Sequence, residues 1–457
     1  MEKEILNILD ENEKELISED LSIKRLGEPL YDSPVDYFKD EYSREKIFID
    51  DYEKMLSIIE SSKVESLKKV QEEIPLFELA GARKKLFFEP GRTKSAIVTC
   101  GGLCPGLNSV IRGIVMMNYY LYKNQITYGI KYGFEGFIKE KGHEVLLLTP
   151  ELVRDIHLEG GTILGSSRGP QDFEQMVNRL VELGVDILYT IGGDGTQKGA
   201  LSLQKEIEKR GLKIAVIGIP KTIDNDIYFV EKSFGFETAF SKACEVIYSA
   251  HVEAEGSNNG IGIVKVMGRD SGFIAASATI ASNLVNFCLI PELDFDLDGE
   301  NGFLRHLERR LLRRKHCVVV VAEGAGQKFV LDEKNVKYDA SGNRKLGDIG
   351  IFLKEKIKSY FAEKNIPVSI KYIDPSYTIR STPPTPNDSI FCIQLAQMAV
   401  HAGMSGRTGM IVGYYNGHFI HIPMELATKK RKKLDLASQL WLSVLESTGQ
   451  PASMKNG

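Results

Sequence analysis

The sequence lacks the features of a membrane, secreted or disulfide-linked protein. No apolar run approaches the roughly 20 residues that an α-helix needs to cross a bilayer. The first residues, MEKEILNILDENEKELISED, are acidic and helix-like, unlike a signal or transit peptide. The six cysteines form no CxxC pair, and the eight histidines form no HExxH. We therefore expect reduced thiols in a cytoplasmic protein and predict no transition-metal site.

An excess of one charge is also lacking. The 457 residues carry a formal net charge of −4, with 43% hydrophobic and 26% charged residues. This balance is typical of a globular protein with a core. It gives no general attraction to nucleic acid or membranes, so we expect neither as a partner. The basic run KKRKK at 429–433 is interpreted as a solvated or phosphate-facing loop, with a nuclear signal or nucleic-acid patch as the alternative.

Short β-branched runs begin after Lys94 and lead into glycine turns and longer amphipathic segments. The runs are SAIVTC, DILYTI, KIAVIGI, GIGIVKVM and HCVVVVAEG. Near-continuous apolar strands that alternate with helices indicate parallel sheets covered on both faces. We predict an α/β protein with two doubly wound parallel-sheet, Rossmann-like domains, whose ligands lie outside the carboxyl ends of the strands.

The same pattern suggests the domain boundaries. The first α/β domain is predicted at residues 95–235, with about 374–425 added to it, and the second at 236–373. Residues 1–94 are highly charged and are predicted to form an extension that packs on or between the domains. A partly disordered tail is the alternative for this extension. Residues 426–457 are predicted to form a C-terminal helical tail.

Two loops are candidates for phosphate binding. TCGGLCPGLN, 99–108, contains Gly102 between a predicted strand and a predicted helix, where backbone amides and the helix dipole favour an anion. This turn is neither a P-loop nor GxGxxG, and a purely structural connection stays open. TILGSSRGPQD, 162–172, places Arg168 beside Gly169, where the guanidinium either clamps a phosphate or lies at the surface.

GGDGTQ, 192–197, follows the apolar run ILYTI and isolates one carboxylate, Asp194, among glycines. Such an acid can hold Mg²⁺ while the amides around Gly193, Gly195 and Thr196 receive phosphate oxygens. The alternative is an Asx turn or a helix N-cap. We favour the functional interpretation, although the same signature occurs in NAD and lipid kinases and does not name the acceptor.

PKTIDND, 220–226, carries two aspartates two residues apart. In an extended backbone, Asp224 and Asp226 point to the same side and raise each other's pKa unless a cation lies near. Phosphoryl transfer to an alcohol needs a positioned base. Asp224 is the candidate, with Lys221 and Mg²⁺ compensating the negative charge. A solvated Asx turn is the alternative.

Three later segments present polar side chains after apolar runs. VMGRDSGF places Arg269 at a strand end between glycines, and AEGAGQ leaves Glu323 as a hydroxyl acceptor or a helix N-cap partner. YIDPSYTIRSTPPTPND is rich in proline and is predicted to form an extended, rigid loop that presents Tyr377 and Arg380. With the earlier loops, these segments supply a base, a Mg²⁺ ligand, phosphate cradles and contacts for a sugar.

In this order and spacing, TCGGLCPGLN, GGDGT, PKTIDND, MGRDSGF, AEG and the segment 377–380 resemble the 6-phosphofructokinase family, over roughly residues 95–425. The resemblance implies transfer of the γ-phosphoryl group of ATP to the 1-hydroxyl of fructose 6-phosphate, with Mg²⁺. The segments outside this range are similar to the long ATP-dependent branch found in trypanosomatids, plants and some bacteria. The family also implies an allosteric homo-oligomer, a dimer of dimers.

The resemblance implies a role for each matching residue. Asp224 matches the proton acceptor, Thr222 its neighbour near the transferred phosphoryl group, and Asp194 the Mg²⁺-linked carboxylate. Further residues of the first α/β domain match the family's nucleotide-binding positions: Gly102, Arg168, Gly169, Gly193, Gly195 and Thr196. The sugar-phosphate side, centred on the second domain, takes Thr222, Ile223, Asp224, Met267, Gly268, Arg269, Glu323, Tyr377 and Arg380. Arg269 and Lys221 join Asp224 and Thr222 as catalytic residues.

The sequence departs from the short bacterial enzymes of the family in the pocket for the 6-phosphate. Tyr377 stands where they carry a histidine, and Gly260 where they carry an arginine that reaches in from a neighbouring subunit. Lys371 is a candidate to replace a second such arginine. Arg380 is the match that remains, so the other contacts of the 6-phosphate stay open.

Two positions bear on the phosphoryl donor. Pyrophosphate-dependent members resemble GGDD where this sequence has Gly195, and they carry a lysine where it has Lys221. An aspartate opposes the α-phosphate of ATP by bulk and charge, whereas a lysine only adds a cation near the transferred group. We therefore predict ATP, with pyrophosphate as the alternative. A non-catalytic regulator that binds sugar phosphate is disfavoured because the predicted catalytic residues are all present, and an oxidoreductase because GxGxxG is missing.

Overall fold

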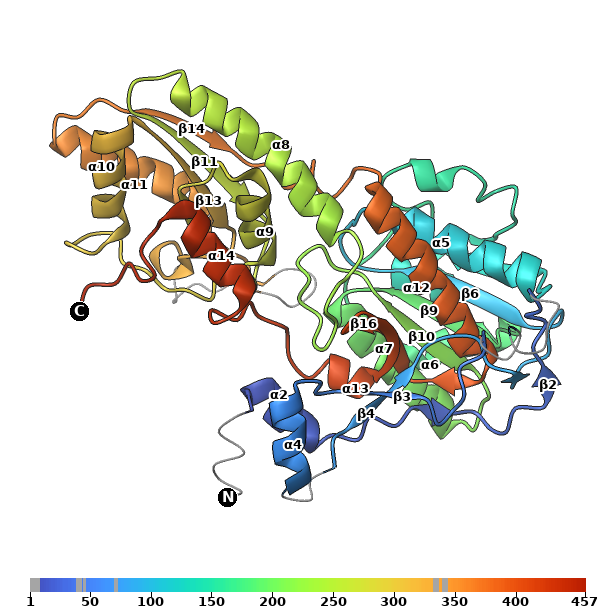
Figure 1. The fold of residues 1–457 in the computed structure, drawn as a ribbon. Coiled ribbons are helices and arrows are strands. Elements are labelled where there is room, and N and C mark those ends of the chain that lie inside the picture. Colours follow the sequence, from blue (N-terminus) through green and yellow to red (C-terminus); the bar gives the residue numbers. More distant parts are fainter. Residues whose placement is uncertain (1–8, 38–42, 44–46, 70–72, 332–336, 339–343) are drawn as a thin grey trace.

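The computed structural model describes residues 9–37, 43, 47–69, 73–331, 337–338 and 344–457. Two sheets, each with helices on its faces, form the two lobes of an elongated molecule (Figure 1). The helices are α2 (Glu11–Ile17), α4 (Ser61–Lys69), α5 (Leu107–Met116), α6 (Phe173–Leu183), α7 (Asp194–Lys209), α8 (Phe236–Glu255), α9 (Phe273–Ser282), α10 (Phe303–Arg314), α11 (Ile349–Glu363), α12 (Pro386–Met404), α13 (Met424–Ala427) and α14 (Gln439–Thr448). Among the described residues, no helix combines the length and the apolar character that crossing a membrane requires.

The larger sheet has nine strands within the described part of the chain. In spatial order they are β3 (Lys54–Leu56), β4 (Leu76–Leu79), β17 (His418–Pro423), β16 (Met410–Tyr415), β10 (Ala215–Pro220), β9 (Ile187–Gly192), β6 (Lys94–Thr99), β7 (Ile126–Ile130) and β8 (Val145–Leu147). The strands from β16 to β7 are parallel, whereas β17, β4, β3 and β8 pair antiparallel with their neighbours. The predicted parallel sheet is therefore correct for the centre and wrong for the edges.

The length of the connections explains the antiparallel edge. β16 and β17 are joined by only Asn416 and Gly417, whose φ angles are 45° and 80°. Two successive residues at positive φ form the tight turn of a β-hairpin, which joins antiparallel strands only. The parallel centre, in contrast, is built from crossovers long enough to hold helices.

Helices cover both faces of the central strands, as predicted for a doubly wound sheet. Ile97 and Ile187 belong to a core formed with α5 and α12 on one face. Their neighbours Val98 and Leu188 belong to a core formed with α6 and α7 on the other. Every residue of β9 and β10 is buried, which is why these strands appear in the sequence as unbroken apolar runs.

The smaller sheet is parallel throughout, as predicted. Its strands, in spatial order, are β12 (Phe287–Leu289), β13 (His316–Ala322), β11 (Gly260–Val266) and β14 (Ser369–Ile373). Alternate valines of β13 point to opposite faces. Val318 and Val320 pack with α8 and α9, and Val319 and Val321 pack with α10 and α11.

The two ends of the chain pack on the sheets. Of the predicted N-terminal extension, β3 and β4 join the larger sheet, β1 (Lys24–Arg25) pairs with β15 (Arg407–Thr408), and β2 (Tyr31–Asp32) pairs with β5 (Lys85–Leu86). Its first eight residues lie outside the described part. At the other end, α14 packs against α9 with Trp441 buried. The domain boundaries themselves stay predictions.

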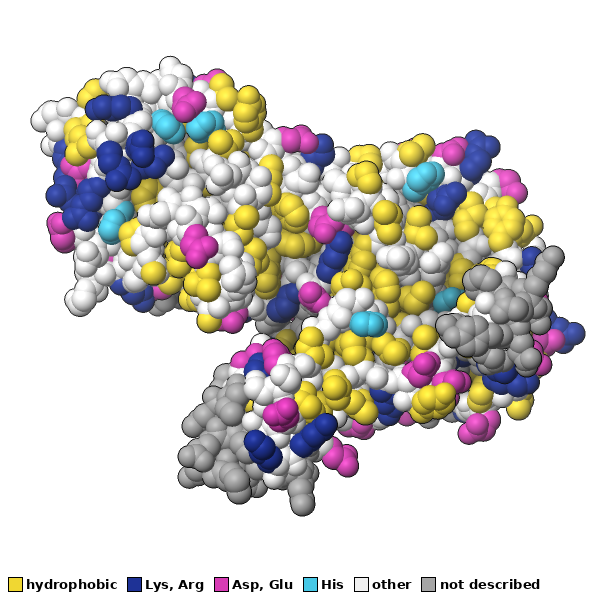
Figure 2. All heavy atoms as spheres, in the orientation of Figure 1, with side chains coloured by type: hydrophobic (Ala, Val, Ile, Leu, Met, Phe, Trp, Pro, Cys, Tyr) yellow, Lys and Arg dark blue, Asp and Glu magenta, His cyan; other side chains and the backbone are white. Residues whose placement is uncertain are grey.

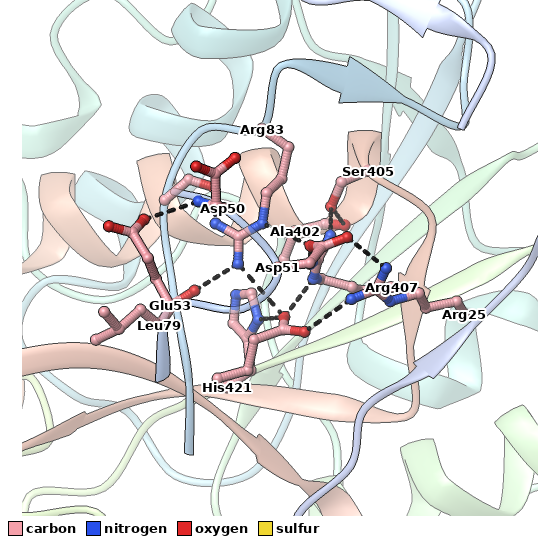
Figure 3. A network of polar contacts seen from close by, with 12 residues as sticks. Arg25, Asp50, Asp51, Glu53, Leu79, Arg83, Ala402, Ser405, Arg407 and His421 are labelled. Atoms are coloured by element: carbon pink, nitrogen blue, oxygen red, sulfur yellow. Dashed lines mark hydrogen bonds and ion pairs between the residues drawn. The ribbon is translucent and has the colours of Figure 1, made fainter. Parts of the chain in front are cut away.

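A buried ionic network joins the extension to the larger sheet (Figure 3). Glu78 on β4 is 7% exposed and accepts hydrogen bonds from Nδ1 of His421 on β17, at 2.7 Å, and from Nε of Arg407 on β15. Arg25 and Arg83 approach the same carboxylate at 3.3 and 3.5 Å. Burial alone raises the pKa of a carboxyl. Here hydrogen bonds from His421 and Arg407 outweigh burial and hold the pKa of Glu78 well below its ordinary value.

Glu78→Ala is expected to destabilise the protein strongly, because it leaves the half-exposed Asp51 as the carboxylate that balances the buried Arg407 and Arg83. Breaking a buried pair in this way costs about 3–5 kcal/mol. The midpoint of urea unfolding measures the loss. Asp32→Ala is the control, since Asp32 is 81% exposed in its pair with Lys85 and its removal leaves the midpoint unchanged. Equal midpoints for the two variants would contradict the role of the network.

Candidate active site

The carboxyl ends of the central strands from both sheets border one cleft of about 1150 Å³. The predicted site residues that line it are Gly102, Arg168, Gly169, Gly193, Asp194, Gly195, Thr196, Lys221, Thr222, Ile223, Asp224, Met267, Arg269, Glu323, Tyr377 and Arg380. Gly268 is not among the lining residues. Its φ of 126° and the carbonyl of Ser271, 2.4 Å from where a Cβ would stand, indicate a conformational role in the turn after β11.

Asp194 lies at the start of α7, directly after β9, with Gly193 as the N-cap residue. The first turn of this helix therefore faces the cleft, where its free amides and dipole favour an anion. Oδ2 of Asp194 accepts a hydrogen bond from Lys198 at 3.0 Å. Its Oδ1 is shielded from solvent and accepts no hydrogen bond from any residue that the structure describes. One oxygen of this carboxylate is thus uncommitted.

The donor atoms around the cleft suit a hard cation. None of the described residues that line it is a histidine. Of the two cysteines that do, burial raises the pKa of the Cys100 thiol to about 12, which disfavours the thiolate that a soft metal ion would bind. Burial also raises the pKa of the Cys104 thiol well above its ordinary value. Carboxylate and hydroxyl oxygens remain, with the uncommitted Oδ1 of Asp194 among them, and this set fits Mg²⁺.

Three cationic side chains converge on the turn after β6. Lys221, at the end of β10, is 5% exposed, and its Nζ donates a hydrogen bond to the carbonyl of Gly102 at 2.5 Å. Guanidinium nitrogens of Arg168 and Arg380 lie 3.3 and 3.8 Å from the position that a Cβ of Gly102 would take. Burial, together with these two arginines, lowers the pKa of Lys221. This side of the cleft is positively charged and suited to phosphate.

The segment 222–226 is a tight turn and not the extended backbone that the spacing of its aspartates suggested. Asn225 has a φ of 54°, and its side chain holds the turn by accepting a hydrogen bond from the amide of Ser233 at 3.0 Å. Thr222 donates to Oδ1 of Asp226 at 2.7 Å and accepts from the amide of Asp224 at 3.1 Å. Residues such as Asn, Asp and Thr form turns of this kind by bonding their own backbone.

Asp224 is partly buried in this turn and faces acids from both sheets. Its Oδ1 is shielded from solvent and accepts no hydrogen bond within the described residues. Burial, followed by the charges of Asp226 and Glu323 and, more weakly, Asp270, raises its pKa well above the ordinary value, while Arg431 opposes the shift. A carboxylate in this setting binds a proton more readily than an exposed one.

The smaller sheet contributes the opposite wall. Glu323 follows β13, and burial raises its pKa although Arg269 opposes the shift. Arg269, after β11, donates a hydrogen bond to the carbonyl of Arg344 at 2.5 Å. Tyr377 is 76% exposed at the rim and lies 4.9 Å, ring centroid to guanidinium carbon, from Arg380. These side chains present cations, a carboxylate and an aromatic edge to the cleft.

Several charged lining residues were not predicted, among them Lys265, Asp374 and Arg431. Lys265 on β11 pairs with Asp374 at 2.8 Å, below the rim formed by Tyr377. Arg431 belongs to the run KKRKK and reaches acids in the cleft, so this run is neither simply solvated nor phosphate-facing at that position. The only sequence signal was the basic run itself. Lys371, considered for the 6-phosphate, instead lies on β14 and approaches Glu253 at 3.8 Å.

Comparisons with known proteins now bear on this cleft. The family model described as Phosphofructokinase matches residues 94–403. The chain belongs to the phosphofructokinase family. The predicted resemblance is thereby confirmed, and the matched range contains β6 to β14 and every predicted site residue.

Relatives within the phosphofructokinase family cover nearly the whole chain. The ATP-dependent 6-phosphofructokinase of Borreliella burgdorferi is 49% identical over 444 residues, which are 96% of this chain and 98% of that protein. The enzyme of that name from Trypanosoma brucei brucei is 48% identical over 376 residues, 82% of this chain and 76% of that protein. The predicted likeness to the long ATP-dependent branch is confirmed, since relatives from trypanosomes and Arabidopsis thaliana belong to this set.

Solved structures show the same fold at lower identity. The structure titled pyrophosphate-dependent phosphofructokinase from Marinobacter aquaeolei superposes with a TM-score of 0.64 at 18% identity. The match covers 78% of this chain and 91% of that one. At such an identity the likeness concerns the phosphofructokinase fold alone.

Asp224→Asn is expected to stabilise the protein at pH 8. The pKa of Asp224 is raised in the folded state, so folding favours its protonated form, and stability falls as the pH rises above the ordinary range of an aspartate. An asparagine has no such dependence. Thermal unfolding should show a Tm higher by on the order of 2 °C at pH 8 and no gain at pH 4. Exposed Asp155→Asn is the control; a Tm for Asp224→Asn at or below wild type at pH 8 would contradict the buried-acid interpretation.

Proposed function

We propose that this protein is an ATP-dependent 6-phosphofructokinase. It transfers the γ-phosphoryl group of ATP to the 1-hydroxyl of fructose 6-phosphate and yields fructose 1,6-bisphosphate and ADP. Relatives of that name are 46–49% identical over most of the chain. The observation that carries the chemistry is Asp224, whose uncommitted oxygen lies between a cationic wall and an acidic wall of one cleft.

Asp224 is the general base in this proposal. Its raised pKa makes it a better proton acceptor for the 1-hydroxyl than an exposed aspartate. The turn holds it in place, because Ser271 donates a hydrogen bond to its carbonyl oxygen at 3.0 Å and Thr222 binds its amide. The base acts only when deprotonated, so turnover falls as the pH drops through this raised pKa.

The cationic wall receives the phosphates. Lys221 and Arg168, together with the amides at the start of α7, offset the negative charge that is shared among the phosphoryl oxygens during transfer. Arg380 grips the 6-phosphate of the sugar. It lies near both Gly102 and Tyr377, so its charge also acts on the transferred group. Arg269, Glu323 and Met267 contact the sugar.

Asp194 is the residue that would hold Mg²⁺, through its uncommitted Oδ1. When bound with the nucleotide, Mg²⁺ neutralises charge on the β- and γ-phosphates. The oxygen-only donor set of the cleft supports this assignment. Thr196 lies in the first turn of α7, two residues after Asp194.

Gly195 supports ATP as the donor. A Cβ at this position meets no atom within 4 Å, and the residue is exposed at the start of α7, so the cleft has room there for the nucleotide. Lys221 is committed to the carbonyl of Gly102 and adds charge without filling that space. A pyrophosphate-dependent phosphofructokinase is the alternative within the family, and a non-catalytic protein that binds sugar phosphate is the alternative outside catalysis.

The predicted homo-oligomer has a candidate surface. Hydrophobic side chains gather over α8 and α12 on the face shown in Figure 2. The exposed hydrophobic residues of these two helices include Tyr248, Ile390 and Ile393, which are 61%, 58% and 40% exposed. Such a patch is typical of an interface. The dimer of dimers, the allosteric control and the cytoplasmic location stay predictions, and light scattering of the purified protein tests the first.

The assay that tests the function compares ATP with pyrophosphate as the phosphoryl donor. Fructose 6-phosphate is the acceptor, and Mg²⁺ is present throughout. ADP should form only when the sugar is present, and pyrophosphate should support little turnover. Asp224→Ser is expected to lower kcat by about 10²–10⁴-fold, the usual share of a general base. Turnover with pyrophosphate alone would favour the alternative within the family; sugar binding without turnover would favour the regulator. Near-normal kcat in Asp224→Ser would remove Asp224 as the base.

Gly195→Asp is expected to weaken ATP use without harming the fold. The new side chain meets no protein atom at its Cβ but places bulk and a negative charge where the nucleotide lies. We expect kcat/KM for ATP to fall at least about tenfold, a free-energy difference near 1.4 kcal/mol, and the Tm to stay unchanged. Gly195→Ala, small and uncharged, should have a weaker effect. Unchanged ATP kinetics in Gly195→Asp would refute the steric argument.

A further inference from the structure

The segment after α13 pairs with the turn that carries Asp224. Arg431 forms a β-bridge with Ile227, and the amide of Lys432 donates to the carbonyl of Asp226 at 2.8 Å. Further along, the amide of Leu434 donates to Glu292 at 2.8 Å, and the chain then reaches α14 on the smaller lobe (Figure 1). The tail therefore crosses from one lobe to the other beside the cleft.

Arg431 is the member of the basic run that faces the cleft. Its Nη1 donates a hydrogen bond to Asp270, in the turn after β11. The same guanidinium lies 3.9 Å from Oδ2 of Asp226 and, through Nε, 3.9 Å from Oδ2 of Asp194. Carboxylates from three elements and both sheets thus surround one cation, whose side chain is 27% exposed.

The neighbouring lysines of the run serve elsewhere. Lys430 pairs with Glu15 of α2 at 2.5 Å, and Lys429 pairs with Glu19. Both partners, Glu15 and Glu19, belong to the N-terminal extension, so these two ion pairs do not involve the acids of the cleft. Lys430 is therefore a matched control, since it offers one positive charge in the same segment without reaching Asp194.

The contacts of Arg431 with Asp270, Asp226 and Asp194 differ in length. The contact to Asp270 is a hydrogen bond, whereas those to Asp226 and Asp194 are longer than a hydrogen bond and rest on charge alone. A divalent cation at Asp194 would meet the guanidinium as a like charge at short range. The contact of 3.9 Å with Asp194 is weaker than the hydrogen bond to Asp270 and breaks first. Arg431 can therefore move away from Asp194 and keep its hydrogen bond to Asp270.

We propose that Arg431, together with Lys198 on Asp194, balances this acid cluster, and that its guanidinium competes with the divalent cation for Asp194. In the nucleotide-free protein the guanidinium balances the carboxylates and keeps the affinity for the bare metal ion low. Metal that arrives with a nucleotide displaces the guanidinium from Asp194. The inference rests on the proposed function, in which Asp194 holds Mg²⁺, and it adds a positioning residue from the C-terminal tail.

Binding of Mn²⁺ to the nucleotide-free protein, followed by electron paramagnetic resonance of the free ion, tests the competition without any turnover. Arg431→Gln is expected to bind Mn²⁺ at least about fivefold more tightly than wild type, because a positive charge about 4 Å from the ligand is removed. Arg431→Lys keeps the charge and should bind like wild type. Lys430→Gln should also bind like wild type.

The double variant Arg431→Gln with Asp194→Asn tests whether the additional Mn²⁺ affinity of Arg431→Gln depends on Asp194. This variant should not show the increase in Mn²⁺ affinity. The proposal is overturned if Arg431→Gln binds Mn²⁺ within twofold of wild type or more weakly, if Lys430→Gln shows the same gain, or if the double variant keeps it. Thermal unfolding checks each variant, and Arg431→Met, which keeps the apolar stem, replaces the Gln variant if that one does not fold. A different result would contradict the proposed function: the wild-type protein would make no ADP from ATP and fructose 6-phosphate.

Discussion

Repulsion among carboxylates at the strand ends is the constraint that shapes this cleft. Parallel strands of both sheets end at one place, and the acids that follow them and line the cleft include Asp194, Asp224, Asp226 and Glu323. Burial and the negative charges of Asp226 and Glu323 disfavour ionisation of Asp224. The protein balances these acids with fixed cations: Lys198 and Arg431 at Asp194, and Arg431 also at Asp226 and Asp270.

The opposite wall carries the complementary charge. Lys221 is buried against Gly102, with Arg168 and Arg380 nearby, so burial and like charge lower the pKa of its ammonium group. The base therefore lies at the boundary between a cationic wall and an acidic wall. Phosphoryl transfer to an alcohol needs both fields at once, because the phosphates arrive negatively charged and the hydroxyl must lose a proton. The same boundary explains why neither wall could be replaced by apolar residues.

The sequence allowed the prediction of features that depend on local pattern. Unbroken apolar runs gave the central strands, and glycines after each run placed Gly102, Asp194 and Arg269 at one edge. Features that depend on distant pairing could not be predicted. β3 and β4 join the sheet through β17, more than 300 residues later in the chain. At 222–226 the spacing of the aspartates favours an extended backbone over the alternative of an Asx turn, and no spacing rule reveals that Asn225 adopts positive φ. Arg431 was missed because the acids it contacts lie far away in the sequence, the nearest being Asp270, 161 residues earlier.

The network at Glu78 and the cation at Arg431 are connected through one short stretch of chain. His421, which donates to Glu78, lies on β17, and α13 follows this strand directly. The basic run begins after α13, so the position of β17 fixes where Arg431 enters the cleft. β17 is in turn held between β16 and β4, the strand that carries Glu78. An extension at one end of the chain thus positions a tail from the other end, and the acid cluster receives its cation only when both are in place.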